Sequence, residues 1–148
     1  MPAPIDHLLL TPAALTPAAL TPAIDLLRAA LPSVEAVYLF GSRAAGLATA
    51  TSDFDLAILN PSPLDPVARF ELASRLAEVL HAEVDLVDLR RASAVMRVQV
   101  LGNSRLLFDG DSSARAVFEA FALSDYARLN EERRGILDDV RARGSIGG

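Results

Sequence analysis

The sequence predicts an α/β domain in which a mixed sheet of about four strands is flanked by helices. Short apolar runs typical of buried strands alternate with segments whose apolar residues recur at helical spacing. A helical segment separates the second apolar run from the third, so these two strands are expected to lie parallel. At 148 residues the chain is long enough to bury the core of one such domain.

The order of the expected elements follows from these runs and from the residues that interrupt them. The first strand, residues 34–40, ends at Gly41, and the second, residues 53–59, ends at Asn60-Pro61-Ser62-Pro63. The second strand is apolar on both faces after its first residues, which is typical of a central strand. The remaining elements are a helix over 65–80, a strand over 83–89, a helix over 93–101, a short strand over 105–108 and a final helix over 113–141.

Two helices carry apolar stripes that predict which side is buried. In the helix over 65–80 the stripe is Phe70, Leu72, Leu76 and Leu80. In the final helix it is Val117, Phe121, Leu129, Ile136 and Val140. The second half of the final helix is heavily charged, so it is a candidate surface for a partner protein.

A five-residue repeat occupies the beginning of the chain. Thr-Pro-Ala-Ala-Leu starts at Thr11 and again at Thr16, and a third copy is cut short after Thr21. A proline at every fifth residue is incompatible with one continuous regular helix across the repeat. Residues 1–21 are therefore predicted to form a mobile extension, with a partner-binding arm as the alternative, and residues 22–148 to form the folded domain.

Composition excludes several classes of protein. The chain has no Cys, its 14 basic residues are all Arg, and it has two His, so thiolate zinc sites, a phosphate-binding loop lysine and a His-rich metal site are excluded or disfavoured. A net charge of −5 argues against direct binding of nucleic acid. No apolar run reaches the roughly 18 residues of a membrane span. The N-terminus lacks the features of a signal peptide, so the protein is expected to be cytoplasmic, with no membrane partner.

The most informative motif is Gly41-Ser42 followed by Asp53-Phe54-Asp55. On a strand, Asp53 and Asp55 share one face at a spacing of roughly 6.6 Å. Paired carboxylates suit Mg²⁺, which prefers oxygen ligands. The Gly-Ser turn offers backbone N–H groups and a hydroxyl to a phosphate chain. Together these residues predict metal-dependent chemistry on a nucleotide.

A third carboxylate is expected from the neighbouring strand, because two divalent ions usually need three carboxylate ligands. Asp85 is the candidate, since it interrupts an apolar strand, and Asp88 and Glu83 are the substitutes. A plain surface position remains the alternative for Asp85. A second Asp-x-Asp, Asp109-Gly110-Asp111, is read as a turn because of its central glycine.

The motif resembles the minimal nucleotidyltransferases (MNT) of the DNA polymerase β superfamily. In that family the loop commonly reads Gly-Ser-Arg-Ala-x-Gly and ends Ser-Asp-x-Asp-Leu. The positions of this chain that match are Gly41, Ser42, Arg43, Ala44, Gly46, Ser52, Asp53, Asp55 and Leu56. The resemblance covers most of the chain from about residue 34 onward, whereas the Thr-Pro repeat has no counterpart in the family pattern.

The resemblance implies a polymerase β-type fold and an enzyme that uses ATP and Mg²⁺, with two ions expected. It implies catalytic and metal-binding roles for Asp53, Asp55 and Asp85, and nucleotide binding by Gly41, Ser42 and Arg43. Proteins of this build are paired with HEPN-domain RNase toxins, and the MNT antitoxin transfers AMP to a tyrosine of the toxin. Two alternatives stay open: an antitoxin that only occludes its toxin, and transfer to a small molecule.

Overall fold

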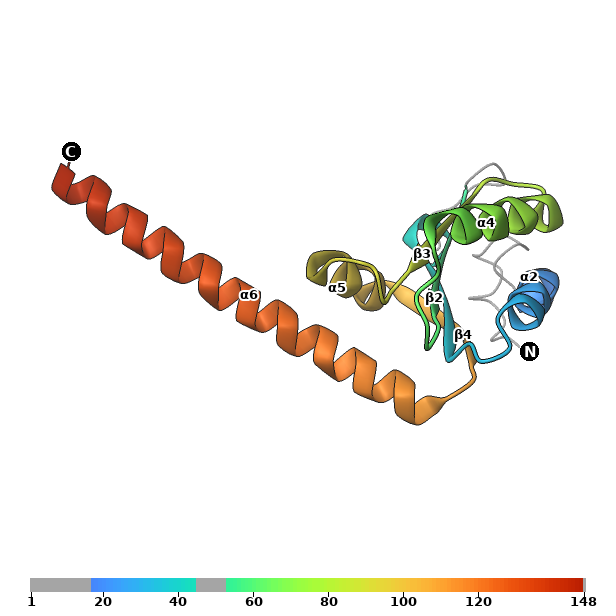
Figure 1. The fold of residues 1–148 in the computed structure, drawn as a ribbon. Helices are drawn as coiled ribbons and strands as arrows, with labels where there is room; N and C mark the ends of the chain where they lie inside the picture. The colour runs from blue at the N-terminus through green and yellow to red at the C-terminus, as the bar shows by residue number, and fades with distance from the viewer. Residues whose placement is uncertain (1–16, 45–52, 148) are drawn as a thin grey trace, which may run out of the picture.

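The computed structural model describes residues 17–44 and 53–147, which form a mixed sheet with helices on both faces (Figure 1). The strand order is β3-β2-β1-β4. β1 pairs antiparallel with β2 and β4, and β2 pairs parallel with β3, as the helical connection predicted. The strands are β1 (Ala36–Phe40), β2 (Phe54–Leu59), β3 (Val84–Asp88) and β4 (Ser104–Asp109).

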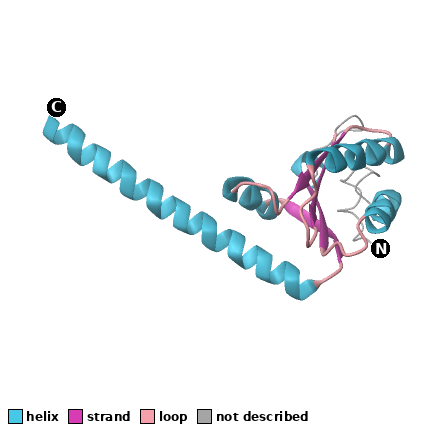
Figure 2. Ribbon diagram, viewed as in Figure 1, coloured by secondary structure: helices cyan, strands magenta, loops and turns pink. Residues whose placement is uncertain are grey.

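In the described part of the chain, both faces of the sheet are covered by helices of more than one or two turns (Figure 2). α2 (Pro17–Ala30) and α4 (Pro66–Leu80) lie on one face, while α5 (Ala94–Gly102) and the first turns of α6 (Ser112–Gly147) lie on the other. A single turn, α3 (Gly41–Ala44), follows β1 directly. Within the described residues, no helix has the combination of length and apolarity that crossing a membrane requires.

The two central strands, β1 and β2, are buried on both sides, so their alternate residues supply two separate cores. In β2, Leu56 and Ile58 pack under α2 and α4, whereas Ala57 and Leu59 pack under α5 and α6. Each fully buried Leu or Ile stabilises the fold by about 1.5–3 kcal/mol. The near-continuous apolar sequence of β2 is therefore explained by its position in the middle of the sheet.

The ends of α4 agree with the predicted bounds and have local causes. Asp65 caps the helix by accepting hydrogen bonds from the N–H groups of Val67 and Ala68, both at 2.9 Å. Pro66 occupies the first turn, where its missing N–H is not needed. His81 ends the helix in a left-handed conformation with φ 54°. His81 therefore has a structural role at the end of α4.

The predicted boundary of the N-terminal extension was wrong. α2 begins at Pro17 and contains Pro22, and Leu20 is fully buried in the core under α4. A proline inside a helix costs about 3 kcal/mol. Burial of Leu20 and Leu27 contributes a comparable or larger amount, which explains how the helix continues through Pro22. The mobility predicted for residues 1–16 lies outside the described residues.

The predicted apolar stripes were partly wrong. Leu72 and Leu76 are buried, but Phe70 is 67% exposed. In α6, Val117 and Phe121 are exposed, and Phe118 and Ala122 are buried instead. The reason is a tertiary contact, because the guanidinium groups of Arg90 and Arg97 lie 5.4 and 5.0 Å from the ring centre of Phe118 and fix which side of α6 faces the sheet.

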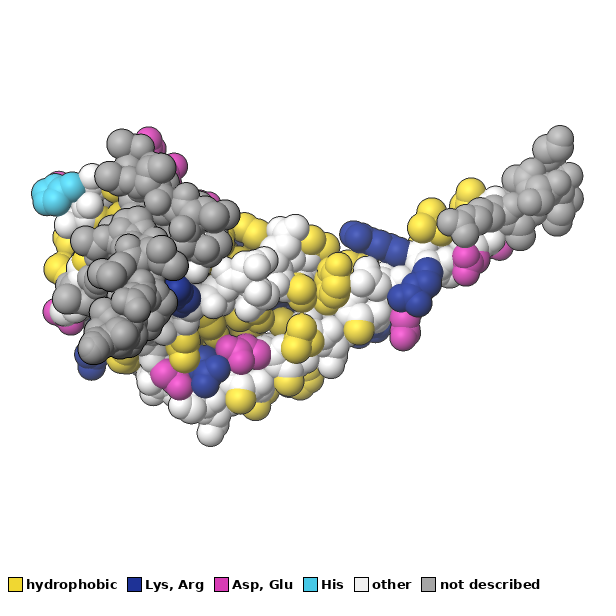
Figure 3. Space-filling model, turned by 180° about the vertical axis from the view of Figure 1, so that it is seen from behind, with side chains coloured by type: hydrophobic (Ala, Val, Ile, Leu, Met, Phe, Trp, Pro, Cys, Tyr) yellow, Lys and Arg dark blue, Asp and Glu magenta, His cyan; other side chains and the backbone are white. Residues whose placement is uncertain are grey.

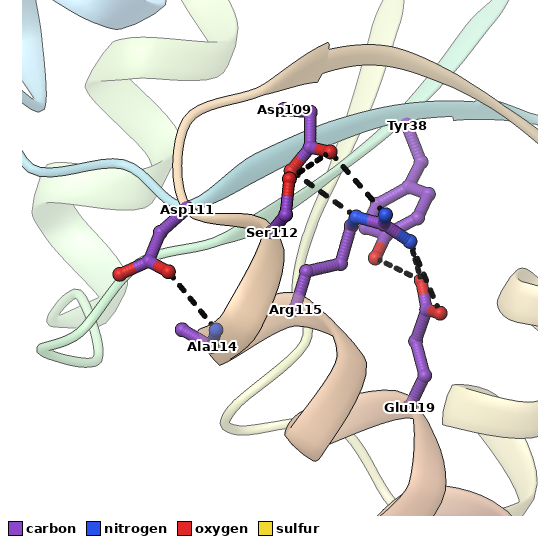
Figure 4. A network of polar contacts seen from close by, with 7 residues as sticks. All are labelled: Tyr38, Asp109, Asp111, Ser112, Ala114, Arg115 and Glu119. Atoms are coloured by element: carbon purple, nitrogen blue, oxygen red, sulfur yellow. Dashed lines mark hydrogen bonds and ion pairs between the residues drawn. The ribbon is translucent and has the colours of Figure 1, made fainter.

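A polar network attaches the first turns of α6 to the sheet (Figure 4). Tyr38 of β1 donates a 2.8 Å hydrogen bond to Glu119, and Arg115 donates to Glu119 at 3.1 Å and to Asp109 at 3.2 Å. Ser112 donates to the other oxygen of Asp109 at 2.7 Å. Burial, and then the hydrogen bond to Glu119, raise the pKa of the Tyr38 hydroxyl well above its usual value, so it remains a donor.

The carboxylate of Asp109 gives this network a pH dependence. The hydrogen bonds from Ser112 and Arg115 lower the pKa of Asp109 in the folded protein. Its contribution to stability is therefore present above the unfolded pKa of about 3.9 and is lost as the pH falls through the folded value. We expect Asp109→Asn to lower the melting temperature at pH 7, and the difference from wild type to shrink below about pH 4.

Thermal unfolding followed by circular dichroism at a series of pH values measures this difference. Glu131→Gln, on the exposed part of α6, is the matched control and should melt like wild type at every pH. A difference between Asp109→Asn and wild type that stays constant from about pH 7 to about pH 3 would contradict a stabilising role of the charge.

Candidate active site

The site is built around the end of β1, where Gly41 lies against Asp55. In the antiparallel register of β1 and β2, Phe40 is opposite Asp55, so Gly41 comes next to the carboxylate. Gly41 has φ +74°, a conformation that other residues rarely adopt. A Cβ at Gly41 would fall within 2.9 Å of Asp55 Cγ and closer still to Oδ2. Glycine is therefore required here both by the backbone and by the neighbouring carboxylate.

The three predicted carboxylates lie at one end of β2 and β3. Asp55 and Asp85 are direct neighbours in the parallel register of these strands, and Asp53 precedes β2. Burial raises the pKa of the Asp55 carboxyl, and the charges of Asp85 and then Asp53 raise it further. The structure thus brings Asp53 and Asp85 close enough to Asp55 to repel its charge.

These carboxylates lie on the side of the sheet that α5 and α6 cover. Asp55 alternates with Ala57 and Leu59, and Asp85 alternates with Val87, all of which belong to the core on that side. Asp55 is half-buried, whereas Asp53 and Asp85 are exposed. β3 is an edge strand, so Asp85 is accessible from the edge of the sheet.

The donor set fits a hard divalent cation that is shared with a substrate. All three groups offer carboxylate oxygens, and their mutual repulsion favours a bound cation. Among the side chains that the structure describes, no group of three or more Asp, Glu, His or Cys is placed so that it could hold a metal ion by itself. Mg²⁺ in nucleotide sites is usually held by one or two carboxylates together with substrate phosphates. An incomplete protein ligand set is what that mode of binding requires.

The alternatives to Asp85 have other roles in the structure. Asp88 is buried on the opposite side of β3, where it accepts hydrogen bonds from the N–H groups of Leu64 at 2.8 Å and Arg90 at 3.1 Å. Glu83 is exposed and precedes β3. Asp85 is therefore the carboxylate of this strand that lies nearest in register to Asp55.

The second Asp-x-Asp forms the turn that its glycine predicted. Asp109 ends β4 and binds Arg115, and Asp111 caps α6 by accepting a 3.0 Å hydrogen bond from the N–H of Ala114 (Figure 4). Both carboxylates are used in holding the start of α6. They serve structure and do not extend the candidate active site.

Part of the predicted nucleotide-binding loop is not described. The backbone of Ser42 and Arg43 forms α3 directly after Gly41, but their side chains lie outside the described part of the structure, as do Gly46 and Ser52. The predicted contacts of Ser42 and Arg43 with a nucleotide therefore remain predictions. α3 as a whole lies against β1, β2 and β4.

Sequence reasoning missed a cavity of about 270 Å³ that Asp85 shares with Arg69, Arg91 and Met96. Arg69 donates to the carbonyl oxygen of Leu86 at 3.1 Å, and Arg91 lies just after β3. The residues come from α4, β3 and α5, so no local pattern joins them. One feature of the sequence could have predicted this cavity. Arg69 lies within the apolar pattern of α4, where an arginine indicates a partly buried charge with a partner.

A mixed sheet with Gly-Ser at the end of one strand and carboxylates at the start of the next two defines a nucleotidyltransferase of the polymerase β type. The family model described as "Polymerase beta, Nucleotidyltransferase" matches residues 24–113. The chain belongs to this family. The expectations of a minimal nucleotidyltransferase and of its fold are thereby confirmed.

One protein of known activity and two solved structures are similar to this chain over most of its length. Protein adenylyltransferase MntA of Shewanella oneidensis is 43% identical over 119 residues, which cover 80% of this chain and 85% of that protein. A crystal structure of a toxin–antitoxin with AMP-PNP matches at 43% identity with a TM-score of 0.72, covering 79% of this chain and 94% of that one. A structure of tri-AMPylated Shewanella oneidensis HEPN toxin with its MNT antitoxin matches at 41% identity and a TM-score of 0.66, covering 79% and 91%.

The close approach of Gly41 and Asp55 predicts the effect of one methyl group. Gly41→Ala should lower the free energy of unfolding by about 1–3 kcal/mol because of the positive φ. It should also displace the Asp55 carboxylate and reduce nucleotidyl transfer at least about 100-fold. Denaturant unfolding and a transfer assay measure the two effects separately.

Gly102→Ala is the matched control, because a Cβ at Gly102 meets nothing within 4 Å. This variant should keep wild-type stability within about 0.5 kcal/mol and should keep full transfer. If the Gly41 and Gly102 variants transfer equally well, the position of the Asp55 carboxylate does not require a glycine at residue 41.

Proposed function

We propose that this protein is an Mg²⁺-dependent adenylyltransferase that moves AMP from ATP to a tyrosine of a partner HEPN RNase toxin and thereby acts as its antitoxin in the cytoplasm. The observation that carries the proposal is the contact between Gly41 and the Asp55 carboxylate, beside Asp85 in register. Its specificity for a protein acceptor is supported by 43% identity to a relative named protein adenylyltransferase.

The reaction joins an acceptor oxygen to the α-phosphorus of ATP and breaks the bond between that phosphorus and the pyrophosphate oxygen. Asp53 and Asp55 would hold Mg²⁺, which when bound stabilises the negative charge of the phosphates. Gly41 lets the backbone approach the phosphate chain, and the Ser42 hydroxyl would donate to it. Asp85 would accept the proton of the attacking hydroxyl.

A tyrosine acceptor needs such a base, because its hydroxyl has a pKa of about 10 and is mostly protonated at neutral pH. Asp85 is exposed on the edge strand, and the cavity that it shares with Arg69 and Arg91 opens beside it. An acceptor side chain would therefore approach from the β3 edge of the sheet. This geometry supports an acceptor presented by another protein.

Removal of the paired carboxylates separates catalysis from binding. Asp53→Asn and Asp55→Asn should each reduce transfer of label from α-phosphate-labelled ATP to the toxin at least about 100-fold. Complex formation should persist, because both residues lie at one end of the sheet and neither is part of the core. Autoradiography of the toxin measures the first effect and size-exclusion chromatography the second.

Asp111→Asn, which alters the other Asp-x-Asp, is the control and should transfer label like wild type. Two results would replace the proposal with an alternative. If the Asp53→Asn/Asp55→Asn double variant still protects cells from the toxin as well as wild type, simple occlusion accounts for the antitoxin effect. If label appears on a small molecule and never on the protein, the acceptor class is wrong.

Metal binding can be measured without catalysis. Mg²⁺ with a non-hydrolysable ATP analogue should raise the melting temperature of wild type, since a ligand at about 100 times its Kd adds about 2.7 kcal/mol. The Asp53→Asn/Asp55→Asn variant should melt above wild type without ligand, because repulsion of Asp55 is relieved, and should gain little on addition. An equal gain in both proteins would remove these residues from the metal site.

A further inference from the structure

The outer half of α6 carries apolar side chains that are not buried against the described part of the domain. The helix projects well beyond the sheet and α5 (Figure 1). Residues 131–140 are all exposed, among them Ile136 at 63% and Val140 at 55%. Figure 3 shows hydrophobic side chains next to charged ones along this projecting part.

These apolar residues continue the side of α6 that packs on the sheet. Phe118 and Ala122 are buried in the core under α6, and Tyr126 follows at the same helical position. Further along, at steps of three or four residues, the same side carries Leu129, Arg133, Ile136 and Val140, which we call the outer seam. Alternating steps of three and four are the spacing of a coiled-coil seam, with Leu129 and Ile136 at d and Arg133 and Val140 at a.

The outer seam is bordered by acids along one side. Asp125, Glu132 and Asp139 recur at seven-residue intervals, which places them at the g positions of the same repeat. The residues at the corresponding e positions are Asn130 and Leu137. Residues at e and g select the partner of a coiled coil and its direction, so one border of this seam is acidic and the other is uncharged.

This pattern disfavours pairing between two copies of α6. In a parallel pair the a positions face each other, which would place Arg133 against its own copy. In an antiparallel pair the g positions face each other, which would align the acidic border with itself. Like charges facing each other across an interface cost several kcal/mol. The charges instead complement a helix that has an acid to meet Arg133 and a basic residue to meet Glu132.

We propose that the outer seam docks an amphipathic helix of the acceptor protein with that complementary charge pattern. That the helix belongs to the acceptor rests on the proposed function. Asp55 and Asp85 lie on the side of the sheet covered by α5 and α6, and the outer seam continues the side of α6 that faces this core. A protein held by the outer seam is thus kept on the same side of the sheet as the carboxylates.

The test measures binding of the purified HEPN toxin without ATP, so that catalysis does not contribute. Ile136→Asp/Val140→Asp should weaken the complex at least about 100-fold, because it places two charges in the apolar contact. Glu132→Arg should weaken it about 10-fold by removing one complementary charge pair. Biolayer interferometry on the full chain gives both values, and circular dichroism confirms that the variants, all at exposed positions, remain folded.

Each variant has a matched control on the opposite side of α6. Ala127→Asp introduces a charge away from the seam, and Glu131→Arg makes the same change as Glu132→Arg one residue earlier. Both controls should bind within about 2-fold of wild type. Equal weakening of the complex by Glu131→Arg and Glu132→Arg would overturn the proposal. The net charge of the protein, and not the position of the charge on α6, would then set the affinity.

The outcomes separate this proposal from the proposed function. Loss of binding by the seam variants, with no AMP transferred by wild type, supports docking and refutes the adenylyltransferase. Transfer by wild type, with seam variants that bind normally, refutes docking alone. An isolated wild-type protein that is a dimer, and that Ile136→Asp/Val140→Asp converts to a monomer, assigns the outer seam to a second copy and overturns the proposal.

Discussion

The close contact between the Gly41 backbone and the Asp55 carboxylate depends on the register of β1 against β2. A shift of one residue would turn Asp55 toward the core under α2 and α4 and bring an apolar residue to Gly41. Burial on both faces of β2 resists such a shift, because Leu56 and Ala57 belong to different cores and would have to exchange places. The geometry of the candidate site is therefore fixed by packing in the middle of the sheet and does not depend on the loop alone.

The Asp55 carboxylate of the candidate site lowers the stability of the fold that positions it. Asp55 is half-buried beside two other carboxylates, and its pKa is raised by burial first and by Asp85 and Asp53 second. Such an arrangement destabilises the folded protein, because the charged form of Asp55 is disfavoured in the folded state. A structure keeps groups of this kind where function needs them and offsets them by packing elsewhere. Here the compensating burial lies in β1, β2 and their helices.

The parts of the fold that follow from local sequence were predictable, and those set by tertiary contacts were not. Apolar runs predict the strands, and capping residues such as Asp65 predict the bounds of α4. The continuation of α2 through Pro22 is decided by burial of neighbouring residues, which a local rule about proline does not include. The same holds for Phe118, whose side of α6 is selected by Arg90 and Arg97 from distant segments. For the site, the carboxylates were predictable from spacing, whereas the cavity beside Asp85 joins three separate elements.

The attachment of α6 connects the projecting helix to the active-site strand. Tyr38 and Glu119 are 81 residues apart in sequence but are joined by a 2.8 Å hydrogen bond, and Arg115 links the same carboxylate to the end of β4. Tyr38 lies on β1 only three residues before Gly41, so the strand that ends at the site also holds the base of α6. Because these groups are partly buried and bonded to one another, the direction of α6 is fixed relative to the carboxylates. The base of α6 and the strand that leads to the candidate site are therefore held together as one unit.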